Sequence, residues 1–341
     1  MGDRRLAGEE FTRVFPGYLT PTAAPATFNA LCHVLQHRVI PGAVLSHTTA
    51  AVLLGIPLPY WIDDGVGLLS TASAGAELPQ STIPSVRSPE VWATDPLRRF
   101  PPLHCRVSTT SRVSAGSGVR VHRGSAEPDT MRIGRLTVAH PLDVLVDLAP
   151  MLAERDLVVA VDAVIGPRDP RTRIGQLLSA DRWTADDIHT LLARRAGRRG
   201  ISRLRRALER ARPGVESPGE TLTRLLLVDA GFPEPVVNLT VTDPITGGER
   251  RIDLAYPDLR LACEYDGDVH RVERGRWRAD ESRRANLAAA GWHLCRLTGG
   301  DLRRPGGFLE RMRIAMTRAG AAVPSSTAWR GLDGLALGWG P

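Results

Sequence analysis

The stretch RRIDLAYPDLRLACEYD, residues 250–266, decides the fold of the C-terminal part of this chain. Its alternating apolar and polar side chains predict two strands, residues 250–256 and 259–266, joined by a proline-containing turn. Successive side chains point to opposite faces of a strand, so one face of this hairpin carries Asp253 from the first strand and Glu264 from the second. Carboxylates that share a pocket are the ligands that a hard divalent cation prefers.

The length of the turn sets which residues of the two strands lie opposite each other. A two-residue loop at Pro257 and Asp258 pairs Asp253 with Ala262 and leaves Glu264 diagonal to Asp253. Diagonal Cβ atoms in such a ladder are roughly 7–8 Å apart. Both side chains can then reach one cation at about 2.0–2.6 Å per oxygen. The alternative is that these acids lie on a solvent-facing edge and bind nothing.

The residues after the second strand add the other groups that phosphodiester hydrolysis uses. Asp266 ends the strand, His270 follows a glycine turn, and Arg283 and Arg284 lie on the next expected helix. In such a site a metal activates water, an imidazole transfers a proton and arginine stabilises the transition-state charge. These residues together therefore indicate a hydrolytic site.

The elements around the hairpin predict a small α/β domain. Ser217, Pro218 and Glu220 have the spacing of a capping box with proline in the first helical turn. The expected order is helix 217–230, strands 236–241, 250–256 and 259–266, helix 277–290, strand 292–297 and helix 307–318.

This part of the chain resembles the DUF559 family, which is similar to the very-short-patch-repair endonucleases of the PD-(D/E)XK superfamily. The resemblance rests on ESPGETLTRLLL, on EYDG-xx-H ending at His270, and on the following D-xx-RR-xx-L-xxx-GW. It implies a restriction-endonuclease-like α-β-β-β-α-β core and Mg²⁺ or Mn²⁺ as cofactor. It also implies that Asp253 and Glu264 bind the metal and that Glu220 is the acid on the first helix.

One position departs from the superfamily pattern. Asp266 stands where the catalytic lysine is usual, and every one of the 44 basic residues of this chain is arginine. Arginine stays protonated, so no basic side chain here can act as an amine base. Either His270 transfers the proton, or the site is inactive and the domain only binds DNA.

The N-terminal half is expected to be mostly helical over residues 1–62, with a possible strand and turn in FTRVFPGYLTP at residues 11–21, and β-rich later. A helix at residues 47–54 lies between Ser46 and Gly55, and strands are expected at 103–110 and 118–124. The segments AVLSHTTAAVLLGIPLP and VAHPLDVLVDLA resemble AbiEi-like type IV antitoxins, which implies a winged-helix-like DNA-binding module. A purely structural role of these helices is the alternative. The expected domains are 1–100 (helical, winged-helix-like), 101–213 (β-rich with a basic helical linker), 214–320 (restriction-endonuclease-like) and 321–341 (a disordered tail).

A basic amphipathic helix is expected at residues 191–212, with nine arginines after residue 193. The chain has a net charge of +7 and a pI of about 10.0, which favours an anionic partner such as DNA. A solvated helix face is the alternative. The arginines expected to contact DNA in this helix are Arg194, Arg195, Arg198, Arg199 and Arg203.

The remaining composition narrows the class of protein. The four cysteines lie far apart without a CxxC pair, which argues against a zinc knuckle or a redox motif. The start lacks a signal-peptide core, and the longest apolar stretch, residues 50–62, is too short to span a bilayer. We therefore expect a cytoplasmic protein without a membrane partner, and no pattern supports oligomerisation.

Three functions follow from these patterns. The first is a metal-dependent DNA endonuclease or nickase that uses the acids and His270. The second is a non-catalytic, antitoxin-type DNA-binding regulator with a degenerate nuclease-like domain. The third is a protein-interaction scaffold in which the acids are a relic.

Overall fold

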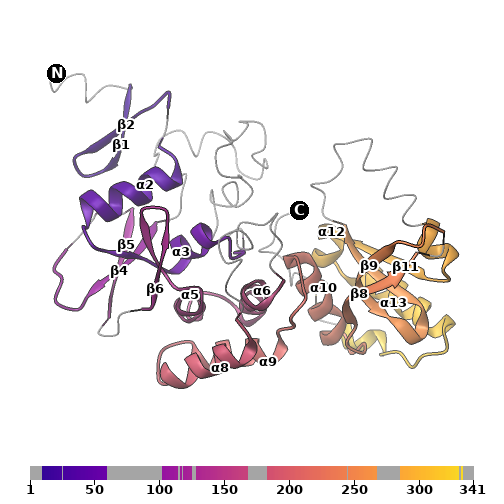
Figure 1. Cartoon of the computed structure of the whole chain (residues 1–341). Helices are drawn as coiled ribbons and strands as arrows, with labels where there is room; N and C mark the ends of the chain where they lie inside the picture. Colours follow the sequence, from indigo (N-terminus) through magenta and orange to yellow (C-terminus); the bar gives the residue numbers. More distant parts are fainter. Residues whose placement is uncertain are drawn as a thin grey trace. The chain divides into compact units, whose positions relative to one another are not determined.

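The chain divides into two compact units (Figure 1). Unit 1 comprises residues 1–160 and 168–209, and unit 2 comprises residues 161–167 and 210–341. The computed structural model describes residues 10–24, 26–59, 102–113, 116, 118–124, 128–167, 183–243, 245–266, 285–329 and 332.

Unit 1 mixes strands and helices. Its elements are β1 (Phe11–Phe15), β2 (Tyr18–Pro21), α2 (Phe28–Val34), η1 (Leu35–Val39), β3 (Val44–Leu45), α3 (His47–Leu54), β4 (Leu103–Ser108), β5 (Val119–Gly124), β6 (Thr130–Ile133), β7 (Leu136–Ala139), α5 (Pro141–Leu148), the first part of α6 (Glu154–Ile165), α8 (Ala185–Arg194) and most of α9 (Ile201–Arg210).

A five-stranded mixed sheet joins distant parts of unit 1. Its order is β5-β4-β3-β7-β6, with β4 parallel to β5 and β3 parallel to β7. The central strand β3 comes from the region expected to be helical, and its neighbours come from the region expected to be β-rich. The strand and turn expected in residues 11–21 are present as β1 and β2, whereas the expectation of helix is wrong for β3. Most of the expected domains 1–100 and 101–213 falls in unit 1. The loop expected at 63–100 lies outside the described residues.

The helices of unit 1 follow the sequence signals closely. Gly55 adopts the left-handed conformation that ends α3, with φ of 77°. Pro141 begins α5, as expected for a proline in the first helical turn. Periodicity leaves residues 157–166 undecided between helix and strand, and they lie mainly in α6. Every residue of α3 is buried, and this helix packs against α5 and β4.

The basic segment is not one helix. The expected helix at 191–212 is interrupted, so that α8 ends at Arg194 and α9 begins at Ile201. Gly197 and Gly200 lie between them with φ of 83° and 87°. Glycine adopts this left-handed conformation without the steric cost of a side chain, which is why the helix breaks there.

Unit 2 begins with a long helix and continues into a sheet. Its elements are α10 (Pro218–Asp229), β8 (Val236–Thr242), β9 (Glu249–Tyr256), η4 (Pro257–Leu259), β10 (Leu261–Asp266), β11 (His293–Thr298), α12 (Gly299–Arg303), α13 (Gly306–Arg318) and η6 (Ser326–Trp329).

The sheet of unit 2 has the order β11-β10-β9-β8. The pairs β8–β9 and β9–β10 are antiparallel, whereas β11 runs parallel to β10. Residues 285–289 are helical and precede β11, and the rest of the helix expected at 277–290 lies outside the described residues. Both units therefore mix α and β structure, as the expected α+β or α/β class requires.

The start of α10 confirms most of the expected cap. Ser217 is extended, and its hydroxyl accepts a hydrogen bond from the Glu220 N–H at 3.2 Å. The Glu220 carboxylate does not return this contact to Ser217, as a capping box requires. It accepts instead from the Glu216 N–H at 3.0 Å, so the reciprocal half of the expected box is wrong.

The C-terminal tail is partly structured. Part of the expected disordered tail is ordered, because η6 forms and the Trp329 ring stacks near Phe232 with centroids 6.2 Å apart. Among the helices in the described ranges, none combines the length and the apolar character needed to cross a membrane.

Candidate metal site

Glu220 is a buried acid at the start of α10. Its side chain accepts hydrogen bonds from the Glu216 N–H and, at 3.2 Å, from the Asn238 amide. Burial and the negative charge of Asp253 together raise the pKa of Glu220 to about 7, although these hydrogen bonds oppose the shift. A carboxyl group with this pKa exchanges protons near neutral pH, a property typical of functional sites.

The pairing of β9 with β10 differs by two residues from the pairing that the sequence predicts, and this shift brings Asp253 and Glu264 closer together. Ala262 pairs with Ala255 and Cys263 with Leu254, because the turn contains the 3-10 segment η4 and Arg260 rather than two residues. The expected pairing of Asp253 with Ala262 is therefore wrong. Continuing the observed register by one pair places Asp253 opposite Glu264. Residues directly opposite in an antiparallel ladder share a face, with Cβ atoms about 4.5–5.5 Å apart.

Hydrogen bonds and charge effects connect these acids. The Tyr265 N–H on β10 donates to the Asp253 carboxylate at 3.2 Å, so this side chain reaches across to the strand of Glu264. Burial and the charges of Cys295, Asp253 and Glu264 raise the pKa of the Cys263 thiol well above its usual value. We call Glu220, Asp253 and Glu264 the acid cluster. It combines a helix start with two adjacent strands.

The acid cluster is more open than a closed three-ligand metal site. Within the described residues, its three carboxylates are not among the groups whose ligand atoms lie close enough to hold an ion together. Asp253 and Glu264 are the two that lie next beyond the last observed pair of β9 and β10, Leu254 with Cys263. Mg²⁺ suits such an arrangement, because it commonly keeps several waters and takes only one or two protein carboxylates.

Asp266 is neutralised by a partner that the sequence did not suggest. Its carboxylate forms an ion pair with Arg296 of the neighbouring strand β11, and both side chains are about one-third exposed. In the β10–β11 register Arg296 lies beside Glu264, two residues before Asp266. The negative charge of Asp266 is thus compensated by an arginine.

The remaining residues expected at this site lie in a segment that is not described. His270, Arg283 and Arg284 all belong to residues 267–284. Their roles stay predictions from the sequence.

The arginines of the basic segment divide into two kinds. Arg195 forms an ion pair with the buried Asp143 at 2.9 Å, and Arg203 donates to the carbonyls of Ala149 and Leu152 at 3.2 and 2.7 Å. Arg198 is half-buried. These contacts hold the helices of unit 1 together, so Arg194 and Arg199 are the expected DNA contacts that are exposed.

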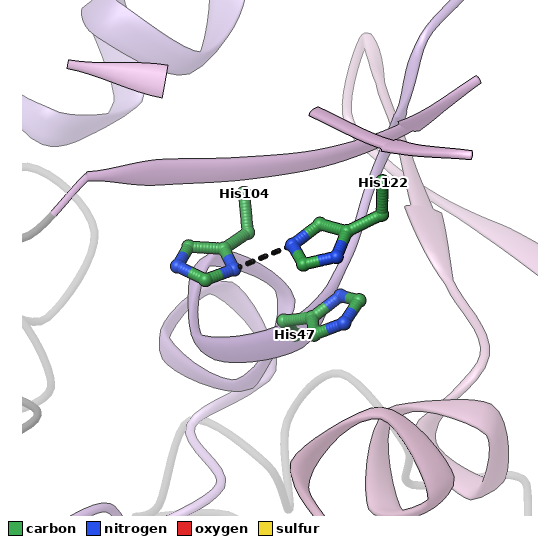
Figure 2. A group of neighbouring side chains, drawn as sticks. All are labelled: His47, His104 and His122. Atoms are coloured by element: carbon green, nitrogen blue, oxygen red, sulfur yellow. Dashed lines mark hydrogen bonds between the residues drawn. The ribbon is translucent and has the colours of Figure 1, made fainter. Parts of the chain in front are cut away.

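A second group, which the sequence analysis missed, lies in unit 1. We call His47, His104 and His122 the histidine cluster. One potential ligand atom of each residue lies within 4.8 Å of the others. Figure 2 shows His104 and His122 projecting from β4 and β5 toward His47 at the start of α3. Its members are separated by 57 and 18 positions, a spacing that matches no short motif; the parallel β4–β5 pairing brings them together.

Burial keeps these imidazoles neutral. Burial, together with the charges of neighbouring histidines and arginines, lowers the pKa of His47 to about 2 and those of His104 and His122 to about 4. Neutral imidazole is the form that binds metals. Among the described residues, the histidine cluster is the set of three or more His, Cys, Asp or Glu side chains whose ligand atoms lie close enough together to hold one ion.

Comparisons with known proteins give relatives from one organism. The chain is 32% identical over 164 residues to the uncharacterized protein MT2308 of Mycobacterium tuberculosis strain CDC 1551 and to the uncharacterized protein Rv2248 of strain H37Rv. Each match covers 47% of this chain and 60% of the relative, so the chain spans about 60% of the length of these curated relatives. No family model and no solved structure matches the chain.

Proposed function

We propose that unit 2 is a metal-dependent DNA endonuclease or nickase, with the acid cluster as its active site. The observation that carries this proposal is the register of β9 and β10, which ends at the pair Leu254 and Cys263 and, continued by one pair, sets Asp253 opposite Glu264. Glu220 is buried, and its pKa responds to the charge of Asp253. Mutually repelling acids that are partly withdrawn from water are stabilised when a cation binds between them. This is the arrangement expected of a hard-metal site.

The chain's residues fit Mg²⁺ or Mn²⁺ by their chemistry. Asp253 and Glu264 would hold the ion, which supplies activation of the attacking water and charge stabilisation. Glu220 has its pKa near 7, so it can accept or return a proton at neutral pH. His270 is the expected second proton-transfer group, on the resemblance to the repair endonucleases.

The order of elements supports the likeness to the restriction-endonuclease-like core. Helix α10 precedes three antiparallel strands, and residues 285–289 lead into the parallel strand β11. This is the α-β-β-β-α-β order that the DUF559 resemblance implies. The acids of the resemblance fall on the helix and on the two inner strands of this sheet.

In this proposal Arg296 supplies the positive charge that the usual lysine of the superfamily would supply. It is half-buried at the edge of the acid cluster and is held by the Asp266 carboxylate. A guanidinium stays protonated and stabilises the charge of a phosphoryl transition state, but it cannot act as a base. Proton transfer therefore belongs to other groups of the site.

A plasmid assay tests the proposal. Supercoiled DNA incubated with the full-length protein and Mg²⁺ or Mn²⁺ should become nicked or linear, and chelation should stop the reaction. Asp253→Asn should lower the rate by about two orders of magnitude or more, because it removes a metal ligand. Asp258→Asn is the matched control, since Asp258 is exposed in η4 of the same hairpin. Absent cleavage with both metals, or equal rates for Asp253→Asn and the wild type, would contradict the proposal.

A non-catalytic DNA-binding regulator is the second candidate. The exposed Arg194 and Arg199, the net charge of +7 and the resemblance to AbiEi-like antitoxins favour it. On this alternative the winged-helix-like N-terminal module reads DNA, and DNA binding does not depend on a metal and falls steeply with salt. DNA binding that is identical with Mg²⁺ and with a chelator, and is unaffected by Asp253→Asn, would support the regulator.

A further inference from the structure

We propose that the histidine cluster binds one divalent transition-metal ion, with Zn²⁺ as the probe, through the imidazoles of His47, His104 and His122. This site lies in unit 1 and is independent of the endonuclease proposed for unit 2. Its three ligand atoms lie within 4.8 Å of one another. Nitrogen ligands favour zinc and its neighbours over Mg²⁺ or Ca²⁺, which prefer oxygen.

The sheet aims two of the ligands at one point. β4 and β5 are parallel, and Arg106 pairs with His122 while His104 lies two residues earlier on the same face of β4. The His104 Nδ1 lies 2.9 Å from the His122 Nε2. Two ligands of a tetrahedral zinc ion with bonds of about 2.0–2.1 Å are separated by roughly 3.3 Å. An ion between these two atoms therefore requires them to move apart by roughly 0.4 Å. The His47 ring stacks on the His122 ring with centroids 3.5 Å apart, so it must also turn to direct a nitrogen at the same ion.

His47 is held in place by neighbours that leave one nitrogen available. Its Nδ1 lies 3.0 Å from the Ser46 hydroxyl and 3.4 Å from the Asp147 carboxylate. Metal-binding histidines commonly engage a carboxylate or hydroxyl through the nitrogen that does not bind the metal. The Nε2 of His47 is therefore the atom available for the ion.

The backbone at His47 is unusual for a non-glycine residue. It has φ of 52°, although His47 begins α3 and is only 7% exposed. A side chain in the left-handed region costs on the order of 1–3 kcal/mol and persists where the surroundings determine it, often at functional sites. Here the strained backbone directs a buried imidazole toward two others.

A buried ion pair lies beside the histidine cluster and balances the positive charge there. Arg106 is 6% exposed and forms an ion pair with Asp147, which also contacts His47. Asp147 therefore offsets the nearest arginine and orients one ligand. With three neutral imidazoles, the fourth coordination position of a zinc ion is left for water or a small anion, as in open zinc sites.

Cobalt spectroscopy of the full-length protein tests the proposal. After removal of metals with a chelator, Co²⁺ is titrated into the wild type while visible absorption is recorded. We expect one equivalent of Co²⁺ to give the intense bands of four- or five-coordinate cobalt, and Zn²⁺ to displace them. Co²⁺ on the oxygen ligands of the acid cluster is six-coordinate and absorbs weakly, so the two sites are distinguishable.

Two variants assign the bands to residues. His122→Gln, on a half-buried side chain, should weaken Co²⁺ binding about tenfold or more. His33→Gln/His37→Gln is the matched control, because these two histidines stack one helical turn apart with ring centroids at 5.6 Å and offer a competing surface site. Bands that survive His122→Gln but vanish in the control would overturn the proposal, as would their absence from the wild type.

A measurement without variants guards against misfolding of His122→Gln. X-ray absorption of the zinc-loaded wild type should give nitrogen ligands at about 2.0–2.1 Å with the scattering pattern of three imidazoles. A shell of oxygen ligands alone would overturn the proposal.

Discussion

Glu220 makes the stability of unit 2 depend on pH in a defined direction. Its pKa is raised from an ordinary value of 4.5 to about 7, so the folded state holds this proton more tightly than the unfolded state. As pH rises from 4.5 through 7, the unfolded state gains a freely hydrated charge while the folded state must bury one. The contribution of Glu220 to the free energy of unfolding therefore falls over this window.

Glu220→Gln tests this effect, because glutamine keeps an acceptor for the Glu216 N–H and carries no charge. In urea denaturation without added metal, the variant and the wild type should be similar at pH 4.5. At pH 8.5 the variant should be more stable by on the order of 3 kcal/mol, the equivalent of the shift in pKa. A stability difference that does not grow with pH would show that Glu220 is ionised as easily as an exposed acid.

Arg296 is the second residue with a specific role in the proposed site. Arg296→Gln removes the cation beside Asp266 and Glu264 while leaving the metal-binding acids in place. We expect at least about tenfold slower plasmid cleavage, because the charge of the transition state loses its partner. Mn²⁺ affinity, measured by electron paramagnetic resonance, should stay equal or rise, because a nearby positive charge is removed.

The control for this prediction is Arg303→Gln, on an exposed arginine of α12. It should leave both the cleavage rate and the Mn²⁺ affinity unchanged. Equal cleavage rates of Arg296→Gln and the wild type would show that Arg296 does not stabilise the transition state.

At the scale of elements, the close approach of α10 to β10 sets the position of Glu220. A Cβ atom on Gly219 would lie 2.1–2.5 Å from ring atoms of Tyr265. Gly219→Ala must therefore displace the helix or the strand, at a cost of about 1–3 kcal/mol. We expect a lower melting temperature together with slower cleavage, because Glu220 is the next residue along the helix.

Gly306→Ala provides the comparison for Gly219→Ala. Gly306 also lies at the start of a helix, α13, but a Cβ atom there meets no atom within 4 Å. This variant should be as stable as the wild type or slightly more stable. If both variants behave alike in thermal denaturation, the contact with Tyr265 does not constrain α10.

Local sequence signals predicted where helices and strands begin and end better than they predicted which strand residues pair. Ser217, Pro218 and Gly55 marked helix ends correctly because caps act within a few residues. The β9–β10 register was wrong by two residues, because a 3-10 turn and a two-residue loop have similar sequence signals at Pro257. Side chains alternate between the two faces of a strand, so a shift by two residues leaves Asp253 and Glu264 on the same face.

At the scale of the whole molecule, nonspecific DNA binding depends on the exposed arginines. Each phosphate contact contributes about −0.9 to the slope of log K against log salt concentration for duplex DNA. Arg194→Gln/Arg199→Gln should therefore make this slope shallower by up to about 2 in fluorescence anisotropy titrations with a chelator present. Arg318→Gln, an exposed arginine of α13, is the matched single-site control. An unchanged slope in the double variant would exclude these arginines from DNA binding.

Long-range contacts were the part of the molecule that the sequence could not reveal. The histidine cluster depends on β3, β4 and β5 lying together, although β3 and β4 are separated by 57 residues between Leu45 and Leu103. The sequence likewise suggested that Arg195 and Arg203 face DNA. Their acceptors, Asp143 and the carbonyls after α5, lie about 50 positions earlier, at separations of 51 to 54 residues.

Asp253 and Glu264 are proposed to hold a metal ion that serves hydrolysis, and crystallography can detect that ion at its site. Crystals of the full-length protein soaked in Mn²⁺ should give an anomalous density peak between these two carboxylates, with Mn–O distances of about 2.0–2.3 Å. The peak should be absent in Asp253→Asn and present in Asp258→Asn. If the wild type shows no peak between Asp253 and Glu264 at a Mn²⁺ concentration that saturates any cleavage, these two residues do not hold the ion.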